Sequence, residues 1–229
     1  MTRGQHDEVG RIHRLIAAHI AHGFEAEHEP YRQAIARLLT RRASDIYDDP
    51  APPAAWELDA LVGAVPPLLR PRPESRDLAH EAMFLSGKLM AYRGLGAARA
   101  MLDATHPVFQ ALAAERPGDL ERQRDLSVSH SLVGDVLRAQ GDMAGALREY
   151  RAALATRERL ASADPSNATW QRDLVVSHYK LASFHRGVGN AAEERAALMR
   201  CREVLRGMRA AGMFLDPPIA RLLAQLEGL

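Results

Sequence analysis

The chain has 229 residues, a formal net charge of +1 and a single cysteine, Cys201. This charge balance excludes the strongly basic composition of a dedicated nucleic-acid binder, and one cysteine excludes an intramolecular disulfide. Ala, Leu, Arg and Glu are abundant and aromatic residues make up only 5% of the chain, a composition that favours an all-α fold.

The N-terminal residues carry no signal for export. The first ten, MTRGQHDEVG, lack the apolar segment of a secretory signal peptide. No stretch of the chain approaches the roughly 18 apolar residues of a transmembrane helix. We therefore expect a cytoplasmic protein that does not associate with membranes.

Residues 1–74 form an N-terminal helical module that does not share the repeat described below. A proline-rich segment interrupts it at 48–53, and another separates it from the rest of the chain at 66–73. The sequence assigns this module to no family. Its apolar spacing predicts three helices: residues 6–22, 29–42 and 54–65.

Histidines are concentrated in this module, which suggests a metal site. Glu25 and His28 also stand three residues apart, the spacing of a ligand pair in di-iron helical bundles. On a helical wheel, however, His19 and His22 face away from the first two histidines, so the side chains do not converge. We expect no metal and no cofactor, and keep a metal- or ligand-sensing N-terminal bundle as an alternative. The histidines concerned are His6, His13, His19, His22 and His28.

One segment of the chain recurs almost unchanged. Residues 123–130 (QRDLSVSH) and 171–178 (QRDLVVSH) agree at seven of eight positions, at an offset of 48 residues, and an Arg-Asp-Leu triplet stands one period earlier at 76–78. A fixed period between about 20 and 50 residues is typical of an array in which each unit packs on its neighbours. We predict three units: 75–122, 123–170 and 171–218.

Each unit reads as two helices joined by a glycine turn and followed by a proline turn. In the second unit the pattern predicts helices over 122–140 and 143–163, separated by Gly141. A proline turn then ends the second helix, and Asn167 is placed to cap the next one. Residues 219–229 follow the third unit and contain an amphipathic helix, 219–227, which we expect to cap the array.

The second unit resembles the tetratricopeptide repeat, in which large, small and aromatic residues recur at fixed spacings across a helical hairpin. Its pattern is His130-x2-Val133-Gly134-x2-Leu137 in the first helix and Ala146-x3-Tyr150 in the second. The resemblance implies a right-handed α-solenoid of three helical hairpins, followed by the capping helix.

The outer units depart from the family pattern. Glu194 stands where the family places alanine, and Pro107 lies inside the second helix of the first unit. The period also exceeds the usual length of about 34 residues, and the extra residues fall between Tyr150 and His178. The chain therefore resembles a long-helix variety of the repeat, of a kind found in bacterial signalling and defence proteins.

This resemblance implies a non-enzymatic adaptor or scaffold that holds a peptide or helix of a partner protein in a concave groove. The likeness to multi-module bacterial proteins implies a partner encoded nearby, and self-association through the degenerate end units is a further alternative. Arg138 and Arg186 occupy equivalent positions and suit an acidic peptide or a terminal carboxylate, although each equally fits an ordinary solvated charge. The groove positions implied are Met83, Gly87, Ser131, Asp135, Arg138, Tyr179, Ser183 and Arg186.

Motifs of catalysis are incomplete in this sequence. The glycines at 94 and 96 belong to a broken dinucleotide fingerprint with no strand before it, and His80-Glu81 lacks the second histidine of a zinc protease. His130 and His178 occupy the slot of a large packing residue, and Cys201 occupies a small-residue slot equivalent to Ala153. We expect packing roles for these three and no catalytic residue.

Overall fold

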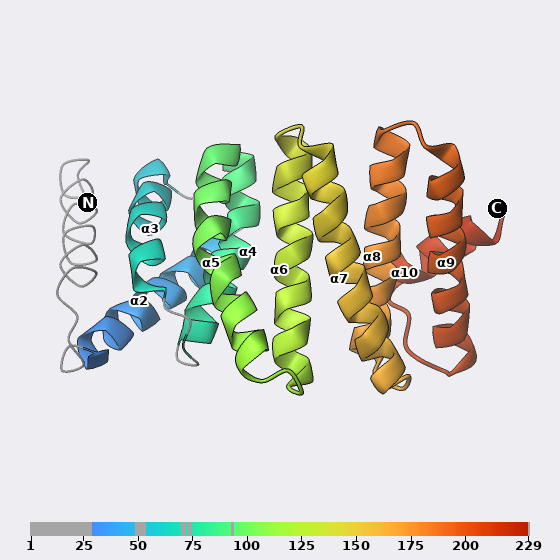
Figure 1. The fold of residues 1–229 in the computed structure, drawn as a ribbon, viewed down its shortest axis with the longest axis horizontal. Helices are drawn as coiled ribbons and strands as arrows, with labels where there is room; N and C mark the ends of the chain where they lie inside the picture. Colours follow the sequence, from blue (N-terminus) through green and yellow to red (C-terminus); the bar gives the residue numbers. More distant parts are fainter. Residues whose placement is uncertain (1–28, 49–53, 70–71, 73–74, 93, 229) are drawn as a thin grey trace. The chain divides into compact units, whose positions relative to one another are not determined.

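The computed structural model describes residues 29–48, 54–69, 72, 75–92 and 94–228 (Figure 1). Within these residues all regular secondary structure is helical, which confirms the all-α fold. The helix predicted over 6–22 lies outside the described residues. None of the described helices has both the length and the apolar character needed to cross a bilayer. The helices are α2 (Glu29–Asp48), α3 (Ala55–Leu68), α4 (Arg76–Tyr92), α5 (Leu95–Glu115), α6 (Leu120–Ala139), α7 (Met143–Ala163), α8 (Ala168–Gly187), α9 (Ala191–Ala210) and α10 (Pro217–Glu227).

Side-chain caps fix where the later helices begin. The Asn167 side chain accepts a hydrogen bond from the backbone N–H of Trp170 at 3.1 Å, so the predicted cap of α8 is confirmed. Aspartate or asparagine does the same at the starts of α6, α7, α9 and α10. Gly141, in the turn before α7, adopts a φ of 88°, a conformation that glycine tolerates best.

Prolines lie inside two of the described helices. We expected α3 to end near residue 65, but it continues through Pro66 and Pro67 to Leu68, whose side chain is completely buried. Helix α5 likewise runs through Pro107. An interior proline costs a helix about 3 kcal/mol, and burial of the apolar residues around it offsets that cost.

The chain divides into two compact units, Met1–Gly141 and Asp142–Leu229. The division falls at the Gly141 turn, in the middle of the second sequence repeat. These two compact units, unit 1 (Met1–Gly141) and unit 2 (Asp142–Leu229), differ in their bounds from the three repeat units of the sequence.

In unit 1, α4 packs on α5 and α5 on α6, while α2 packs on α4 and α3 on α5. One continuous apolar core joins all five helices, so the described part of the N-terminal module shares its core with the first repeats. Its largest fully buried side chains are Leu58, Leu68, Met83, Leu85, Leu89, Met101, Leu102, Phe109 and Leu112.

In unit 2, α8 packs on both α7 and α9, and α10 packs on α9. Leu223 and Leu226 of α10 are buried in a core shared with α8 and α9, as expected for a helix that covers the end of the hairpin. The other buried members of this core are Val175, Ala182, Leu198, Cys201, Leu205 and Met208.

The glutamine that opens each copy of the repeated segment has the same structural role in both units. In unit 1 the Nε2 atom of Gln123 donates a hydrogen bond to the carbonyl oxygen of Ala113, at 3.1 Å. In unit 2 the Nε2 atom of Gln171 donates to the carbonyl oxygen of Ala161, at 3.0 Å. Each bond ties the start of one helix to the last turn of the preceding one, where carbonyl groups lack intrahelical partners. This role accounts for the repetition of the glutamine.

Candidate functional site

Helix α8 of unit 2 carries three of the predicted groove residues on its outer side. Tyr179 is 45% exposed, Ser183 is half-buried and Arg186 is exposed. They are separated by four and then three residues, so they line one side of the helix. We call these three residues the α8 stripe. An aromatic side chain left in solvent at its start is the kind of residue that dominates binding energy in interfaces.

Arg186 is not a free cation within this stripe. Its Nε atom lies 2.6 Å from the Oε1 atom of Glu194 on α9, and its side chain is 61% exposed. The hydrogen bond with this carboxylate raises the pKa of Arg186 above its ordinary value. An acidic ligand would have to compete with Glu194 for the guanidinium.

Two predicted groove residues are not exposed in unit 1. Met83 on α4 is fully buried, because α2 and α3 share a core with α4 and cover it. Ser131 is also buried, on a helix that packs against both α4 and α5. The expectation that these two side chains line a groove surface is therefore wrong. Asp135 is half-buried, and Arg138 and Gly87 are exposed, as expected.

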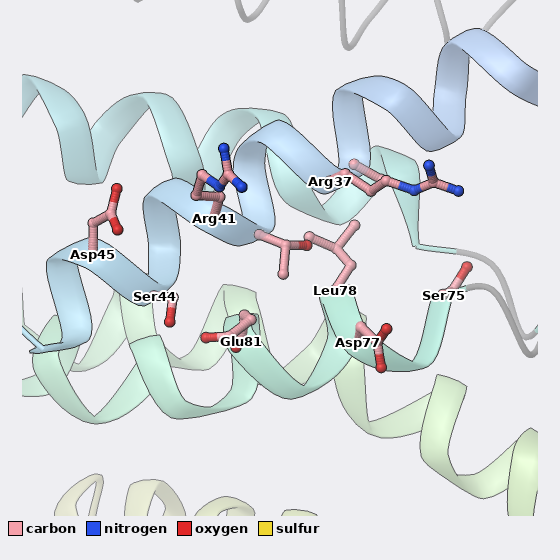
Figure 2. Close-up of a pocket in the computed structure, with 10 residues that line it drawn as sticks. Arg37, Arg41, Ser44, Asp45, Ser75, Asp77, Leu78 and Glu81 are labelled. Carbon is pink, nitrogen blue, oxygen red and sulfur yellow. The ribbon is translucent and has the colours of Figure 1, made fainter.

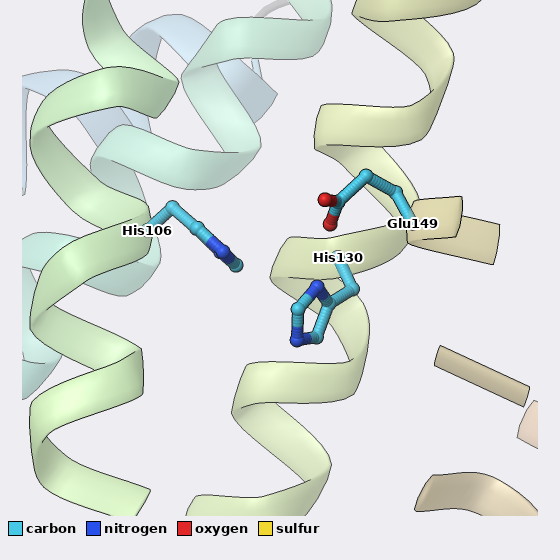
Figure 3. Close-up of side chains that lie close together, drawn as sticks. All are labelled: His106, His130 and Glu149. Atoms are coloured by element: carbon cyan, nitrogen blue, oxygen red, sulfur yellow. The ribbon is translucent and has the colours of Figure 1, made fainter. Parts of the chain in front are cut away.

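Histidines 106 and 130 of unit 1 form a contact that the sequence does not predict. Their rings meet edge to face with centroids 4.7 Å apart (Figure 3). The Nδ1 atom of His106, on α5, lies 2.9 Å from the hydroxyl oxygen of Ser129 on α6. His130 is half-buried, which agrees with its predicted packing slot. The repeat pattern does not single out His106, because the histidine does not recur: the equivalent position one period later is Leu154.

In unit 2, His178 and Cys201 are buried, as their predicted packing slots require. Burial and the nearby charge of Arg200 lower the pKa of His178. Burial alone raises the pKa of the Cys201 thiol to about 11. A thiol that stays protonated at neutral pH is a poor nucleophile, so the structure gives this cysteine a packing role.

A buried carboxylate joins α4 to α6 within unit 1. The side chain of Asp125 is 4% exposed, and its two oxygens lie 2.6 Å from the Nε atom of Arg76 and 2.9 Å from the Nε2 atom of His80. Burial opposes the charged form and is the largest single influence on this carboxyl group. The hydrogen bonds from His80 and Arg76 outweigh it, so the pKa of Asp125 lies below its ordinary value. These contacts connect structural elements and leave the carboxylate covered.

A cleft of about 540 Å³ lies between α2 and α4 in unit 1 (Figure 2). The sequence does not predict this cleft, because its two walls come from segments on opposite sides of the proline-rich stretch. Its volume falls within the range of small-ligand sites. The lining residues are Ala36, Arg37, Thr40, Arg41, Ser44 and Asp45 on α2 and Ser75, Asp77, Leu78 and Glu81 at the start of α4.

The N-terminal histidines considered as metal ligands lie outside the described residues, so that alternative stays a prediction. Comparison of the chain with models of known protein families and with curated proteins finds no match. The resemblance to the tetratricopeptide repeat therefore depends on the residues of this chain and their burial.

Proposed function

We propose that this chain is a non-enzymatic adaptor of the tetratricopeptide kind, which binds a peptide or helix of another protein. The observation that carries this proposal is the exposure of Tyr179 on α8, whereas most large apolar side chains of that helix are buried. Exposed aromatic residues on a rigid helix are favourable binding anchors, because they bury a large area at a low cost in side-chain entropy.

The burial pattern supports the family resemblance. The slots that the repeat reserves for packing are occupied by buried side chains on α4 and α8, and by half-buried side chains such as His130 and Val133 on α6. The buried ones include Leu85, Leu89, Leu181 and Ala182. We propose on this basis that the three hairpins follow the right-handed solenoid path of the family.

The two full copies of the repeated segment divide their residues by role. Identical residues such as Gln123 and Gln171 hold helices together, as their matching hydrogen bonds show. The positions that follow the segment differ in part between the copies: the buried Ser131 stands where the next copy has the exposed Tyr179, and Asp135 where it has Ser183, whereas Arg138 and Arg186 are identical. A common scaffold that exposes an aromatic side chain in one copy only suits recognition of one particular partner.

The charges of the α8 stripe suggest what such a partner offers. Because Arg186 is already paired with Glu194, the proposed binding energy comes mainly from an apolar side chain placed against Tyr179. An acidic residue of the partner, positioned beside Arg186, would fix the orientation of the bound segment. We propose a cytoplasmic partner that presents this pair of features and is encoded near the gene for this chain.

The test compares two exposed side chains on the same hairpin. The full-length chain is used to capture proteins from extract of its own cells, and bound proteins are identified by mass spectrometry. We expect Tyr179→Ala to reduce capture of the principal partner at least tenfold. Met199→Ala, which removes a side chain that is 40% exposed on α9, serves as the matched control and should leave capture unchanged.

Equal loss in both variants, or no loss in either, would contradict the assignment to the α8 stripe. Circular dichroism and melting of each variant establish whether the helices are intact. We expect them to be unchanged, because both side chains lie largely outside the core.

A further inference from the structure

The cleft between α2 and α4 has an apolar and hydroxyl-lined floor with a charged rim. The buried or half-buried members of its lining form the floor, whereas the exposed members form the rim. Figure 2 shows Ser44 of α2 facing Glu81 of α4 across this space. The floor residues are Ala36, Thr40, Ser44, Ser75, Leu78 and Glu81.

Glu81 is the only charged residue among these floor positions. It accepts a hydrogen bond from Ser44 on the opposite helix, and the two side chains approach each other in Figure 2. Burial, followed by the negative charge of Asp48, raises the pKa of Glu81, and Asp77 adds to the effect. The neighbouring His80 and the hydrogen bond from Ser44 act in the opposite direction and do not outweigh these effects. The negative charge of Glu81 is therefore only partly compensated within the described part of unit 1.

The rim is electrically balanced. Arg37 and Arg41 on α2 are matched by Asp45 on the same helix and Asp77 on α4, and all four are exposed. The lining as a whole thus has one excess negative charge, which is the carboxylate in the floor. A cation that enters the cleft gains from this charge in a partly desolvated place, where an electrostatic contact is stronger than at the open surface.

We propose that this cleft binds a guanidinium or ammonium group carried on a short apolar stem, with Glu81 as its charge partner. The cationic head reaches the floor carboxylate, and the hydroxyl groups of Thr40 and Ser44 offer further acceptors for its N–H groups. The stem lies against Leu78 and Ala36. This site is separate from the α8 stripe and does not depend on the adaptor function proposed above.

Two sources supply this chemistry: the side chain of arginine or lysine in a peptide, and a free amine or amino acid. The exposed guanidinium groups of Arg37 and Arg41 at the rim suit a ligand that also carries a carboxylate. The cationic probes used in the experiment distinguish these sources, because they carry the same cationic head and differ in the group at the other end of the stem: a blocked backbone, a free carboxylate with an amine, or an amine alone.

The experiment is calorimetric titration of the full-length chain with N-acetyl-arginine amide, free arginine and agmatine. N-acetyl-citrulline amide, which has the same shape without the charge, is the matched probe. We expect one molecule of N-acetyl-arginine amide to bind per chain, at least tenfold more tightly than the citrulline compound. Of the three cationic probes, only free arginine carries a carboxylate. If it binds more strongly than the amide or agmatine, the carboxylate of the ligand contacts the rim arginines.

Variants locate the site. Glu81→Gln should weaken binding of N-acetyl-arginine amide at least tenfold, whereas Glu121→Gln, which makes the same change at an exposed position on α6, should leave it unchanged. Thr40→Trp fills the cleft without altering its charge and should abolish binding of every probe. Absence of binding at millimolar concentrations, equal binding of the citrulline compound, or unchanged binding by Glu81→Gln would each overturn the proposal.

Discussion

Arg76 and Asp125 belong to Arg-Asp-Leu triplets one period apart, and the Nε atom of the arginine lies 2.6 Å from the Oδ2 atom of the aspartate. The repeated triplet therefore ties α4 to α6 directly. His80 completes the arrangement at the second carboxylate oxygen. Because the pKa of Asp125 is lower in the folded chain than in the unfolded one, these contacts add stability above the ordinary pKa of the carboxyl group. That stability is lost as the pH falls through the lowered value.

The Asp125→Asn variant should lose about 1.5 kcal/mol of unfolding free energy at pH 7, the lower end of the range for hydrogen bonds to a charged group, because the side chains of Arg76 and His80 are partly exposed to water. Urea unfolding at pH 7 and at pH 3 measures the difference, which should shrink in acid as the wild-type carboxylate is protonated. Asp103→Asn is the control, because Asp103 forms an exposed pair with Arg99 on the same helix. It should change stability by less than about 0.5 kcal/mol. A loss at Asp125 that is independent of pH would contradict this account.

Glu81→Gln should have the opposite effect on stability. The pKa of Glu81 is raised above its ordinary value in the folded chain, so holding it ionised opposes folding at neutral pH. The glutamine variant removes that cost, and its melting temperature should be slightly higher than that of the wild type at pH 7. The difference should disappear as the pH falls well below the ordinary pKa of the carboxyl group, because the wild-type side chain is then protonated in both states. A lower melting temperature for the variant at pH 7 would show that the carboxylate is better compensated than its surroundings indicate.

Cys201 should be unreactive while unit 2 is folded. Its thiol is fully buried and its pKa is raised to about 11, so labelling with a thiol reagent at pH 8 should require unfolding of α9. Time courses with and without denaturant measure this protection. A Ser166→Cys change in a Cys201→Ala background places a thiol in an exposed turn and should react at once. Rapid labelling of native Cys201 would mean that unit 2 opens locally.

Gln123→Ala and Gln171→Ala should cost similar amounts, about 1 kcal/mol each, because each removes the equivalent hydrogen bond to a carbonyl group at a helix end. Gln171 also loses a longer, exposed contact of 3.4 Å with the carbonyl oxygen of Pro165, which should add little. Gln110→Ala, at an exposed position on α5, controls for the change in helix propensity and should be near neutral. Chemical unfolding of the three variants provides the comparison. A large cost for one glutamine and none for the other would argue against equivalent roles.

The ion pair between Arg186 and Glu194 allows two variants with opposite expected effects on partner capture. Arg186→Gln should weaken binding of an acidic partner, whereas Glu194→Gln releases the guanidinium and should strengthen it. Neutral substitutions are preferable to charge reversal, because glutamate at position 186 would stand beside the carboxylate of Glu194. Co-precipitation at two salt concentrations measures both effects. Weakening by both variants would indicate that the pair itself, rather than the arginine, contacts the partner.

The sequence predicts the repeat helices well because local signals agree with one another there. Helix α7 matches its predicted bounds, since Asp142 caps its start and a proline turn follows its end. The capping helix is placed correctly for the same reason, although it begins two residues earlier, at Pro217. Helix α2 continues six residues past its predicted end to Asp48, because Ala43 and Ile46 are buried in the core.

Long-range packing is what the sequence did not reveal. Nothing in residues 29–68 indicates that α2 and α3 cover α4, so Met83 was expected at the surface and is in fact in the core. The same packing creates the cleft around Glu81, whose walls come from segments at least 30 residues apart. Tyr179 was found because repeat periodicity places it on the outer side of its helix, a local property.

A tandem repeat has no intrinsic starting point, and the position of Gly141 gives a physical reason to choose one. Counted from the glycine turns, the chain contains the 48-residue stretches 94–141 and 142–189, each ending in a glycine with positive φ. The first encloses the bond between Gln123 and Ala113, and the second the bond between Gln171 and Ala161. Each stretch also falls entirely within one compact unit. To graft this repeat onto another protein or to extend the array, these stretches are the natural units to exchange. Every copy then contains its own hydrogen bond between the glutamine and the preceding helix.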